Sequence, residues 1–295
     1  MATLTIDGGG NGFRRAIVKN GKVKNYVATN SGEVKNIDEF LYFVQDGVSL
    51  GVTGIACGIA GAIDNGVMVN SPNIPWMNGF NIESEIYNRF GIKTRGYNDA
   101  QTFTAGMAWL LKLAHLLGQT WSSGVGGRIL ANGVIPAYCE SAHVRVDYSP
   151  YAALCSCGLR GCFEAIFGGE AVKRRVISEM AAMGRSIPDG IHPCKFLDKM
   201  YKAGDKWAVD FYDIIAMAMG SYLASICNNS GVSIVVWKGT FAENALPLIE
   251  DKIRMYMVKG SMNPKFGSEV KFMFSPDPVN DGLIGADALF RGVYK

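Results

Sequence analysis

The sequence has little net charge and no strongly basic stretch. Its 29 lysine and arginine residues against 26 acidic residues leave a net charge of +3. The basic residues are scattered, apart from short runs at 14–15 and 173–175. A nucleic-acid-binding surface needs basic side chains gathered on one face or along one helix. We therefore expect no nucleic-acid partner.

The sequence also lacks a secretory leader. Met1 runs directly into the β-prone segment 3–6, without the basic region and apolar stretch of a signal peptide. The most apolar window, 214–226, is shorter than the roughly 18 to 20 residues that a membrane span needs. We interpret it as a buried helix, and we expect a cytoplasmic protein without a membrane partner.

A disulfide framework is not indicated either. The seven cysteines are an odd number, and three of them lie within 155–162, unlike the dispersed cysteines of a disulfide-stapled secreted domain. A reducing compartment with a metal site explains this crowding better.

The segment 155–162 reads Cys-Ser-Cys-Gly-Leu-Arg-Gly-Cys, and His143 lies twelve residues before its first cysteine. Three thiolates and one imidazole complete a closed, tetrahedral Zn²⁺ site, which makes the predicted zinc structural; buried or redox-active thiols are the alternative. A further pair, His192 with Cys194, offers only two ligands and predicts no second site. The predicted zinc ligands are His143, Cys155, Cys157 and Cys162.

Strand-like and helix-like segments alternate along the chain. This alternation is typical of an α/β protein with parallel or mixed sheets. No repeat or Pro/Ser-rich linker separates the two lobes that we expect, 1–117 and 118–279. Strands are predicted at 4–7, 14–18, 54–59, 94–97, 128–130, 233–237 and 270–274, and helices at 38–45, 83–90, 98–117, 165–183, 209–228, 243–257 and 282–290.

Two glycine-rich segments follow or precede strands. Segment 7–12 reads Asp-Gly-Gly-Gly-Asn-Gly and predicts a hairpin turn whose backbone N–H groups can surround a phosphate. Asp7, at the end of the strand, is placed to hold Mg²⁺ through water. Segment 122–127, Ser-Ser-Gly-Val-Gly-Gly, suggests a second phosphate loop. Neither is a Walker loop, and a plain flexible turn is the alternative for the first.

Three acidic residues are candidates for chemistry on a hydroxyl group. Asn98 and Asp99 stand where a strand meets a helix, so either can be a helix cap, while Asp99 can also be a general base. Glu140 and Glu164 flank the metal loop, and their carboxylates can accept hydrogen bonds from a sugar. Taken singly, each glutamate is equally explained as a surface charge.

In this order the motifs resemble the ROK family (repressors, open reading frames and sugar kinases) of the actin-like ATPase superfamily. The most specific match is 155–164, which fits the family's C-x-C-G-x-x-G-C-x-E at every fixed position. Similar segments are 7–11 (D-x-G-G-T in the family), 71–78 (P-N-L-P-x-W-x-N), 98–101 (N-D-A-N), 122–127 (G-T-G-V-G-G), 140–143 (E-I-G-H) and 282–286 (G-x-x-G-A).

The resemblance implies a two-lobed, actin-like (ribonuclease H-like) α/β fold with a zinc-binding loop at 139–164. A closing helix at about 280–295 would return to the first lobe. The resemblance also implies a homodimeric, glucokinase-like enzyme that uses ATP and Mg²⁺ to phosphorylate a hexose or N-acetylhexosamine bound between the lobes, with Asp99 as the base.

The same resemblance implies the roles of individual residues. The residues that would contact the sugar are Asn78, Asn98, Asp99, Glu140, His143 and Glu164. The residues that would contact the nucleotide are Asp7, Gly8, Gly9, Gly10, Asn11, Ser123, Gly124, Gly126 and Gly239.

The nucleotide side departs from the family pattern. Asn11 replaces a threonine, Ser122 and Ser123 replace Gly and Thr, and Met107 replaces a glutamate. A non-catalytic sugar-binding or sugar-sensing protein is therefore the alternative. ROK repressors normally carry a helix-turn-helix before the first phosphate strand, and here that strand begins within a few residues of Met1.

Overall fold

The computed structural model describes residues 2–30 and 32–295 of the chain. The chain forms two compact units. Unit 1 comprises Met1–Gly118, Arg128–Cys139 and Ser275–Lys295, and unit 2 comprises Gln119–Gly127 and Glu140–Phe274.

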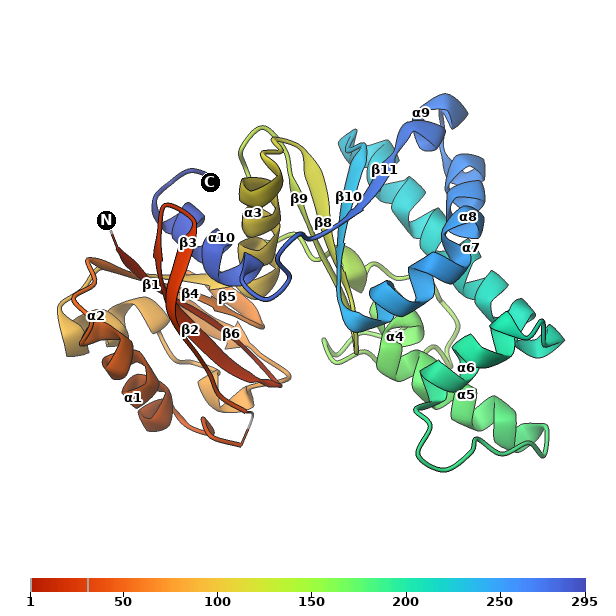
Figure 1. Ribbon diagram of the computed structural model, residues 1–295, viewed down its shortest axis with the longest axis horizontal. Coiled ribbons are helices and arrows are strands. Elements are labelled where there is room, and N and C mark those ends of the chain that lie inside the picture. The colour runs from red at the N-terminus through yellow and green to blue at the C-terminus, as the bar shows by residue number, and fades with distance from the viewer. Residues whose placement is uncertain (1, 31) are drawn as a thin grey trace. The chain divides into compact units, whose positions relative to one another are not determined.

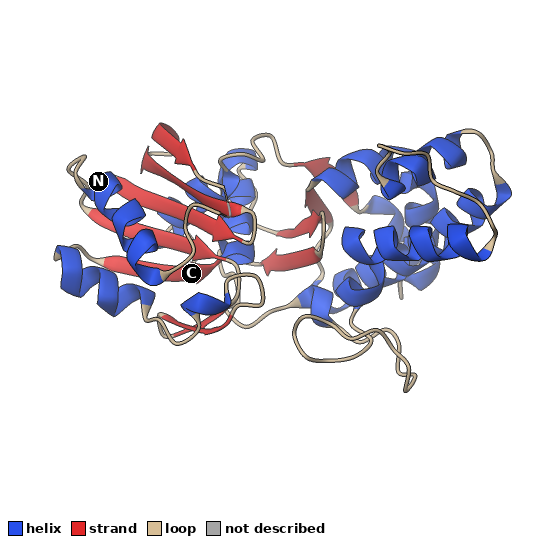
Figure 2. Cartoon of the chain, turned by 90° about the horizontal axis from the view of Figure 1, so that it is seen from below, coloured by secondary structure: helices blue, strands red, loops and turns tan. Residues whose placement is uncertain are grey.

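Unit 1 is built on a five-stranded sheet with the order β3-β2-β1-β4-β7 (Figure 1, Figure 2). Strands β1, β4 and β7 run parallel to one another, while β1–β2 and β2–β3 are antiparallel hairpins. The elements are β1 (Thr3–Gly9), β2 (Gly12–Lys19), β3 (Lys22–Ala28), α1 (Ile37–Val48), β4 (Gly54–Ile59), β5 (Ala62–Asp64), β6 (Val67–Asn70), η1 (Pro75–Met77), α2 (Ile82–Phe90), β7 (Thr94–Asn98), α3 (Asp99–Leu111) and α10 (Asp281–Phe290).

Side chains of β1 alternate between two layers of helices. Leu4 and Ile6 belong to the apolar cluster that includes Phe40 of α1 and Ile86 of α2. Thr3 points the other way and donates to Asp287 of α10. Helices α1 and α2 thus cover one face of the sheet, and α10 with its neighbour α3 covers the other (Figure 1).

A buried carboxylate holds α10 to the sheet. Asp287 has no exposed surface and accepts hydrogen bonds from Thr3 Oγ1 at 2.8 Å and from Arg291 Nε at 2.9 Å. The Arg291 guanidinium lies 5.0 Å from the ring centre of Trp109 on α3.

We expect Asp287→Ala to lower the free energy of unfolding by about 3–5 kcal/mol, because it leaves the largely buried Arg291 charge unpaired. Thermal unfolding of the two proteins measures the difference. Asp287→Asn, which keeps an acceptor for Thr3, is the control and should lose less. An alanine variant as stable as wild type would show that the pair contributes nothing.

A second sheet has the order β11-β10-β8-β9, with β10 and β11 parallel. The remaining elements are β8 (Leu116–Trp121), β9 (Val125–Leu130), η2 (Ser141–His143), α4 (Phe163–Phe167), α5 (Gly169–Ala182), α6 (Pro193–Lys202), α7 (Lys206–Ser230), β10 (Ile234–Lys238), α8 (Thr240–Gly260), α9 (Pro264–Glu269) and β11 (Lys271–Phe274).

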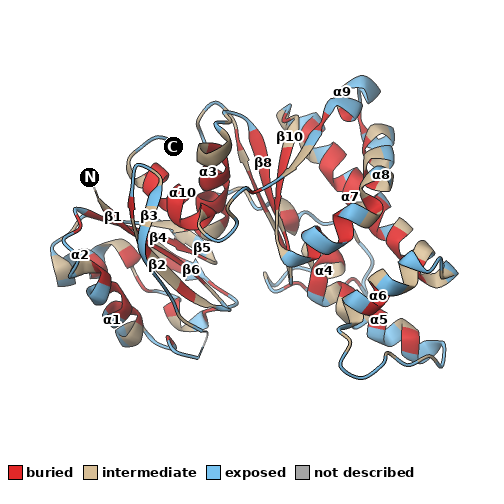
Figure 3. Cartoon of the chain, viewed as in Figure 1, coloured by how far each residue is buried: buried red, intermediate tan, exposed pale blue. Residues whose placement is uncertain are grey.

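Helix α7 corrects an argument made from the sequence. Its 25 residues, with a mean hydropathy of 1.2 over the best window of 18, are long and apolar enough to cross a membrane by length and composition. The expectation that this segment is too short was therefore wrong. Half of the window is buried within the protein, α7 packs on α8, and Figure 3 shows buried positions along it. Burial, and not length, supports its interpretation as a core helix.

Two predicted helices were wrong in extent. The helix predicted at 98–117 ends at Leu111, because Lys112 turns into the left-handed region at φ 55°, and β8 follows from Leu116. The helix predicted at 165–183 is two helices, α4 and α5, separated at Gly168. Strands β3, β5, β6 and β8 and helices α6 and α9 were not predicted.

Candidate functional site

The first glycine-rich segment forms the predicted hairpin. Gly9 pairs with Gly12 across β1 and β2, which leaves Gly10 and Asn11 as the turn. Gly12 has φ +127°, and a Cβ there would lie 2.2 Å from the carbonyl oxygen of Thr29. No larger residue fits this position without moving the backbone.

Asp7 belongs to the third residue pair of the same hairpin, counted from the turn, and its exposed fraction is only 9%. Its carboxylate accepts a hydrogen bond from Arg14, the residue directly across from it on β2. The sequence analysis missed Arg14. The signal was present, because residues paired across an antiparallel hairpin place their side chains on the same face of the sheet.

The carboxyl ends of the parallel strands collect several predicted residues. Asn98, at the end of β7, donates from Nδ2 to the carbonyl of Gly61 at 2.8 Å. Ser71 donates from Oγ to the neighbouring carbonyl of Ala60 at 2.6 Å, and its own N–H donates to Oδ1 of Asn78 at 2.8 Å. Asn78 and Asn98 therefore both connect, one of them through Ser71, to the segment that follows β4. Ligands of open α/β sheets bind at this edge.

The cap of α3 is Asn98. Its Oδ1 accepts from Ala100 N at 2.9 Å, and the Gln101 side chain accepts from Asn98 N at 3.2 Å, which completes a capping box. Asp99 is the first residue of the helix, is partly buried, and accepts from Ala100 N through Oδ1 at 2.9 Å. The capping alternative left open for the pair thus belongs to Asn98.

The four predicted metal ligands meet at one point. The ligand atoms of His143, Cys155, Cys157 and Cys162 all lie within 4.8 Å of one another, and no other such cluster occurs within residues 2–30 and 32–295. The Sγ atoms of Cys157 and Cys162 are 3.7 Å apart, and Cys155 Sγ is 3.4 Å from His143 Nδ1. Tetrahedral zinc, with bonds of about 2.3 Å to sulfur and 2.0–2.1 Å to nitrogen, separates such pairs by about 3.8 and 3.6 Å. The residues therefore fit zinc.

Backbone turns shape this loop. Gly158 and Gly161 have φ values of +89° and +79°, and a Cβ on Gly161 would lie 1.8 Å from the carbonyl oxygen of Asp147. Burial raises the pKa of the Cys155 thiol. It also raises the pKa of the Cys162 thiol, to about 12. Thiols with raised pKa values stay protonated at neutral pH, so a bound metal would have to displace their protons.

Glu164 links the metal loop to the second glycine loop. Its Oε1 lies 3.9 Å from Cys155 Sγ and accepts from Ser156 Oγ at 3.3 Å, while its Oε2 accepts from Val125 N at 3.2 Å. A Cβ on Gly124 would lie 2.8 Å from the same Oε2. The glycine thus gives the carboxylate room to reach the loop.

The loop between β8 and β9 rests on the start of α5. The carbonyls of Ser122 and Ser123 accept from the N–H groups of Gly169 and Glu170 at 2.9 and 2.8 Å. Gly239, with φ +115°, begins α8 beside it, where a Cβ would lie 2.5 Å from the carbonyl oxygen of Trp121. Ser123, Gly124, Gly126 and Gly239 are therefore gathered around one end of β8.

A buried tyrosine joins this loop to the segment that carries His143. Tyr222 on α7 contacts Ser141 Oγ at 2.9 Å and Gln119 Oε1 at 3.2 Å, and Ser141 donates to the carbonyl of Gly127 at 3.0 Å. The ring of Tyr222 stacks on the ring of Phe163, and the two ring centres are 4.3 Å apart. Pattern reasoning missed this network, because Tyr222 lies within an apolar helix and carries no motif.

The order of these segments along the chain matches a known family. A comparison with models of protein families assigns residues 3–293 to the ROK family. The chain belongs to the ROK family. The predicted actin-like fold of the α/β class is confirmed by this match and by the solved structures that the ROK protein resembles.

Three relatives of this ROK protein are informative. It is 26% identical to a glucokinase of Thermotoga maritima over 316 residues, which cover 99% of this chain and 98% of the relative. It is 24% identical to an N-acetylmannosamine kinase of Haemophilus influenzae, with 85% of each chain covered. A ROK family glucokinase from Streptomyces griseus, solved with glucose and AMPPNP, superposes with a TM-score of 0.77 at 22% identity over 98% of this chain and 99% of that one.

Each unit of the ROK protein holds part of the predicted site. His192 and Cys194 lie outside the metal cluster. Arg128, at the end of the second glycine-rich segment, is 1% exposed and donates to the carbonyl of Pro136. Unit 1 carries Asp7, Gly8, Gly9, Gly10, Asn11, Asn78, Asn98 and Asp99, and unit 2 carries Ser123, Gly124, Gly126, Glu140, His143, Cys155, Cys157, Cys162, Glu164 and Gly239.

Proposed function

We propose that this ROK protein is a sugar kinase that transfers the terminal phosphoryl group of ATP to a hydroxyl of a hexose or an N-acetylhexosamine. The proposal is supported above all by the start of α3. Asn98 caps the helix there, and Asp99 presents a carboxylate at the carboxyl edge of the sheet. The glucokinase and N-acetylmannosamine kinase relatives support the same reaction class.

Asp99 is the proposed general base. Its carboxylate would take the proton from the attacking sugar hydroxyl, which makes that oxygen a better nucleophile toward phosphorus. Its neighbour Asn98 is fixed by hydrogen bonds at both ends of its side chain, to Gly61 and to Ala100. This anchoring limits how far the start of α3, and with it Asp99, can shift.

The other proposed sugar contacts follow from hydrogen-bonding capacity. Carboxylates of Glu140 and Glu164 accept from hydroxyl groups, and the His143 ring N–H that is not used for metal can donate. Asn78 and Asn98 offer amide groups near the end of β4. These side chains would hydrogen-bond to hydroxyl groups that many hexoses share. They therefore indicate the class of substrate, a hexose or N-acetylhexosamine, and not one particular sugar.

The proposed cofactors have different roles. Zinc on His143, Cys155, Cys157 and Cys162 would fix the loop that carries Glu164, and Mg²⁺ would neutralise charge on the phosphates of ATP. The glycine hairpin after Asp7 and the loop at Ser123–Gly126 offer backbone N–H groups to those phosphates. The homodimer and the cytoplasmic location stay predictions.

A substrate panel tests the proposal. Purified protein is incubated with ATP, Mg²⁺ and single hexoses or N-acetylhexosamines, and ADP release is followed. We expect release that depends on one or a few sugars and that the variant Asp99→Asn lacks. Sugar-dependent ADP release that persists in this variant would remove Asp99 from the role of base.

The second candidate is a sugar-binding protein without turnover. It is favoured by Asn11, Ser122 and Ser123 in place of the family's residues and by Arg14 on the Asp7 carboxylate. Thermal stabilisation by a sugar without ADP release from any member of the panel would support this candidate over the kinase.

A further inference from the structure

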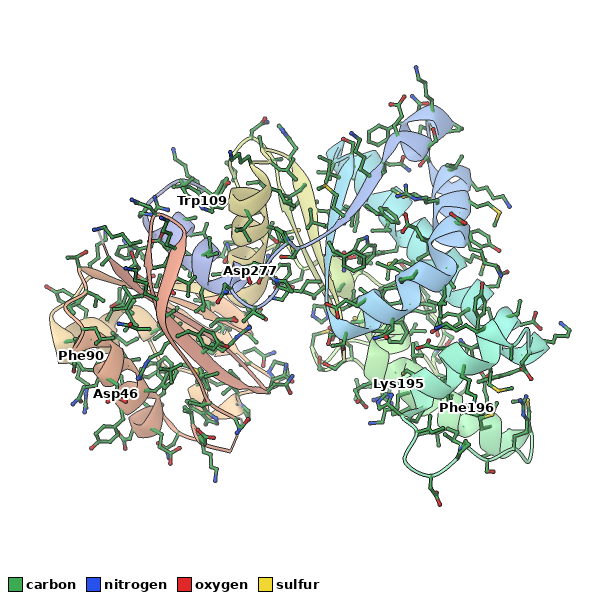
Figure 4. All side chains as sticks on the ribbon, viewed as in Figure 1. Asp46, Phe90, Trp109, Lys195, Phe196 and Asp277 are labelled. Carbon is green, nitrogen blue, oxygen red and sulfur yellow. The ribbon has the colours of Figure 1, made fainter. Side chains whose placement is uncertain are left out.

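The Asp7 carboxylate, which the sequence assigns to magnesium, is already paired with a cation of the chain. Arg14 Nη2 donates to Asp7 Oδ2, and Arg14 Nη1 donates to the carbonyl of Val279 at 2.9 Å. The guanidinium is thus held at two points, by a side chain of β1 and by the backbone of the segment before α10. Figure 4 labels Asp277 on this segment.

A second, buried carboxylate stands at the start of α10, the helix that follows Val279. Asp281 has no exposed surface, and it accepts from Ser275 Oγ at 3.0 Å and from Gly282 N at 2.7 Å. An arginine guanidinium stays protonated in proteins. Arg14 therefore remains charged in this position.

The start of α10 lies against Asp7. A Cβ on Gly282 would lie 3.1 Å from the Asp7 carboxyl carbon, so the first turn of this ten-residue helix abuts the carboxylate. The partial positive charge of this helix N-terminus is offset by Asp281, whose carboxylate accepts from Gly282 N. Arg14 is thus the cation that compensates Asp7 before any metal binds, and the pull of Asp7 on a divalent cation is weaker than that of an unpaired carboxylate.

We propose that Arg14 is a positioning residue of the nucleotide site at the glycine hairpin. By pairing with Asp7 it weakens the binding of Mg²⁺ by that carboxylate, and its own positive charge attracts the nucleotide phosphates. This inference rests on the proposed function, since it requires that the hairpin binds a nucleotide. As a consequence, the wild-type protein should bind nucleotide without Mg²⁺ better than a variant without this arginine does, and it should need more Mg²⁺ for the metal to add to that binding.

The test is equilibrium binding of a fluorescent ADP analogue at a series of Mg²⁺ concentrations, including none. Arg14→Met removes the charge and keeps much of the apolar stem. We expect the Mg²⁺ concentration for half-maximal binding to fall about tenfold, because Asp7 is released to the metal. Metal-free binding of the analogue should weaken about fivefold, because the phosphates lose a charge-assisted partner.

Arg15→Met is the matched control. Arg15 is the next residue of β2 and carries the same charge, but its guanidinium lies 4.6 Å from the Phe43 ring and 3.4 Å from Asp46. This variant has the same net charge as Arg14→Met and should keep the wild-type metal dependence. Arg14→Lys should also keep it, since the charge is retained.

Equal metal dependence in Arg14→Met and wild type, or in Arg14→Met and Arg15→Met, overturns the inference. If Arg14→Met does not fold, Arg14→Gln keeps a donor for the Val279 carbonyl and answers the same question. Wild-type protein that binds no nucleotide at any Mg²⁺ concentration overturns both the inference and the proposed function. Nucleotide binding without sugar-dependent ADP release contradicts the kinase alone and leaves the Arg14 comparison valid.

Discussion

Replacing Asp99 with asparagine is expected to lower kcat for sugar phosphorylation by about 10²–10⁴-fold, the range typical of a lost general base. Asparagine has nearly the same shape and keeps an oxygen for the hydrogen bond from Ala100 N, so α3 should still begin at this residue. The amide cannot take the hydroxyl proton. Steady-state kinetics should therefore show a fall in kcat with a change of only a few-fold in KM for the sugar.

Asp38→Asn is the matched control for this variant. Asp38 is likewise an acidic residue in the first turn of a helix, α1, and it is exposed. Both variants remove a negative charge from a helix N-terminus, where it is worth about 0.3–1 kcal/mol. Only the Asp99 variant should lose turnover. An Asp99→Asn protein with wild-type kcat would refute the assignment of the base.

Loss of the metal cluster should produce the second large effect. In Cys162→Ser, the bound zinc should fall from about one ion per chain to near none, because the hydroxyl is a poor substitute for a buried thiolate. The loop around Gly158 and Gly161 folds around the ligands, so metal binding and local folding are linked. We expect a marked drop in Tm and weaker sugar binding, measured by elemental analysis, thermal unfolding and calorimetry.

Cys194→Ser makes the same chemical change in the same unit, outside the cluster. It should keep its zinc and bind sugar as wild type does. Treating the wild-type protein with a chelator should reproduce the behaviour of Cys162→Ser. Wild-type protein that contains no zinc, or that melts at the same temperature with and without it, would show that the cluster does not brace the loop.

Local sequence patterns predicted the elements best where one signal dominated. The β1–β2 hairpin follows from alternation interrupted by a glycine-rich turn, and α8 and α10 follow from apolar spacing. The end of α3 was missed because apolar residues continue through Leu116 and Leu117 into β8, and only the left-handed backbone at Lys112 separates the two elements. Short polar elements such as β3 were missed because β3 buries too little apolar surface to show a period.

The sequence by itself determined the family and indicated the four residues, His143, Cys155, Cys157 and Cys162, that the fold brings together as a possible metal site. Three closely spaced cysteines and one histidine have few other uses, and metal coordination requires these residue types almost regardless of the surroundings. The hairpin glycines are similarly constrained, because Gly12 adopts a backbone conformation that side chains disfavour.

The tertiary structure alone decided what anchors the Asn98 side chain and what encloses the Asp7–Arg14 pair. Both depend on partners far away in sequence: Gly61 accepts from the Asn98 amide, and Val279 and Gly282 lie against Arg14 and Asp7. A hydrogen bond or a Coulomb interaction acts over a few ångströms of space. Its partners are therefore fixed only when the chain has folded.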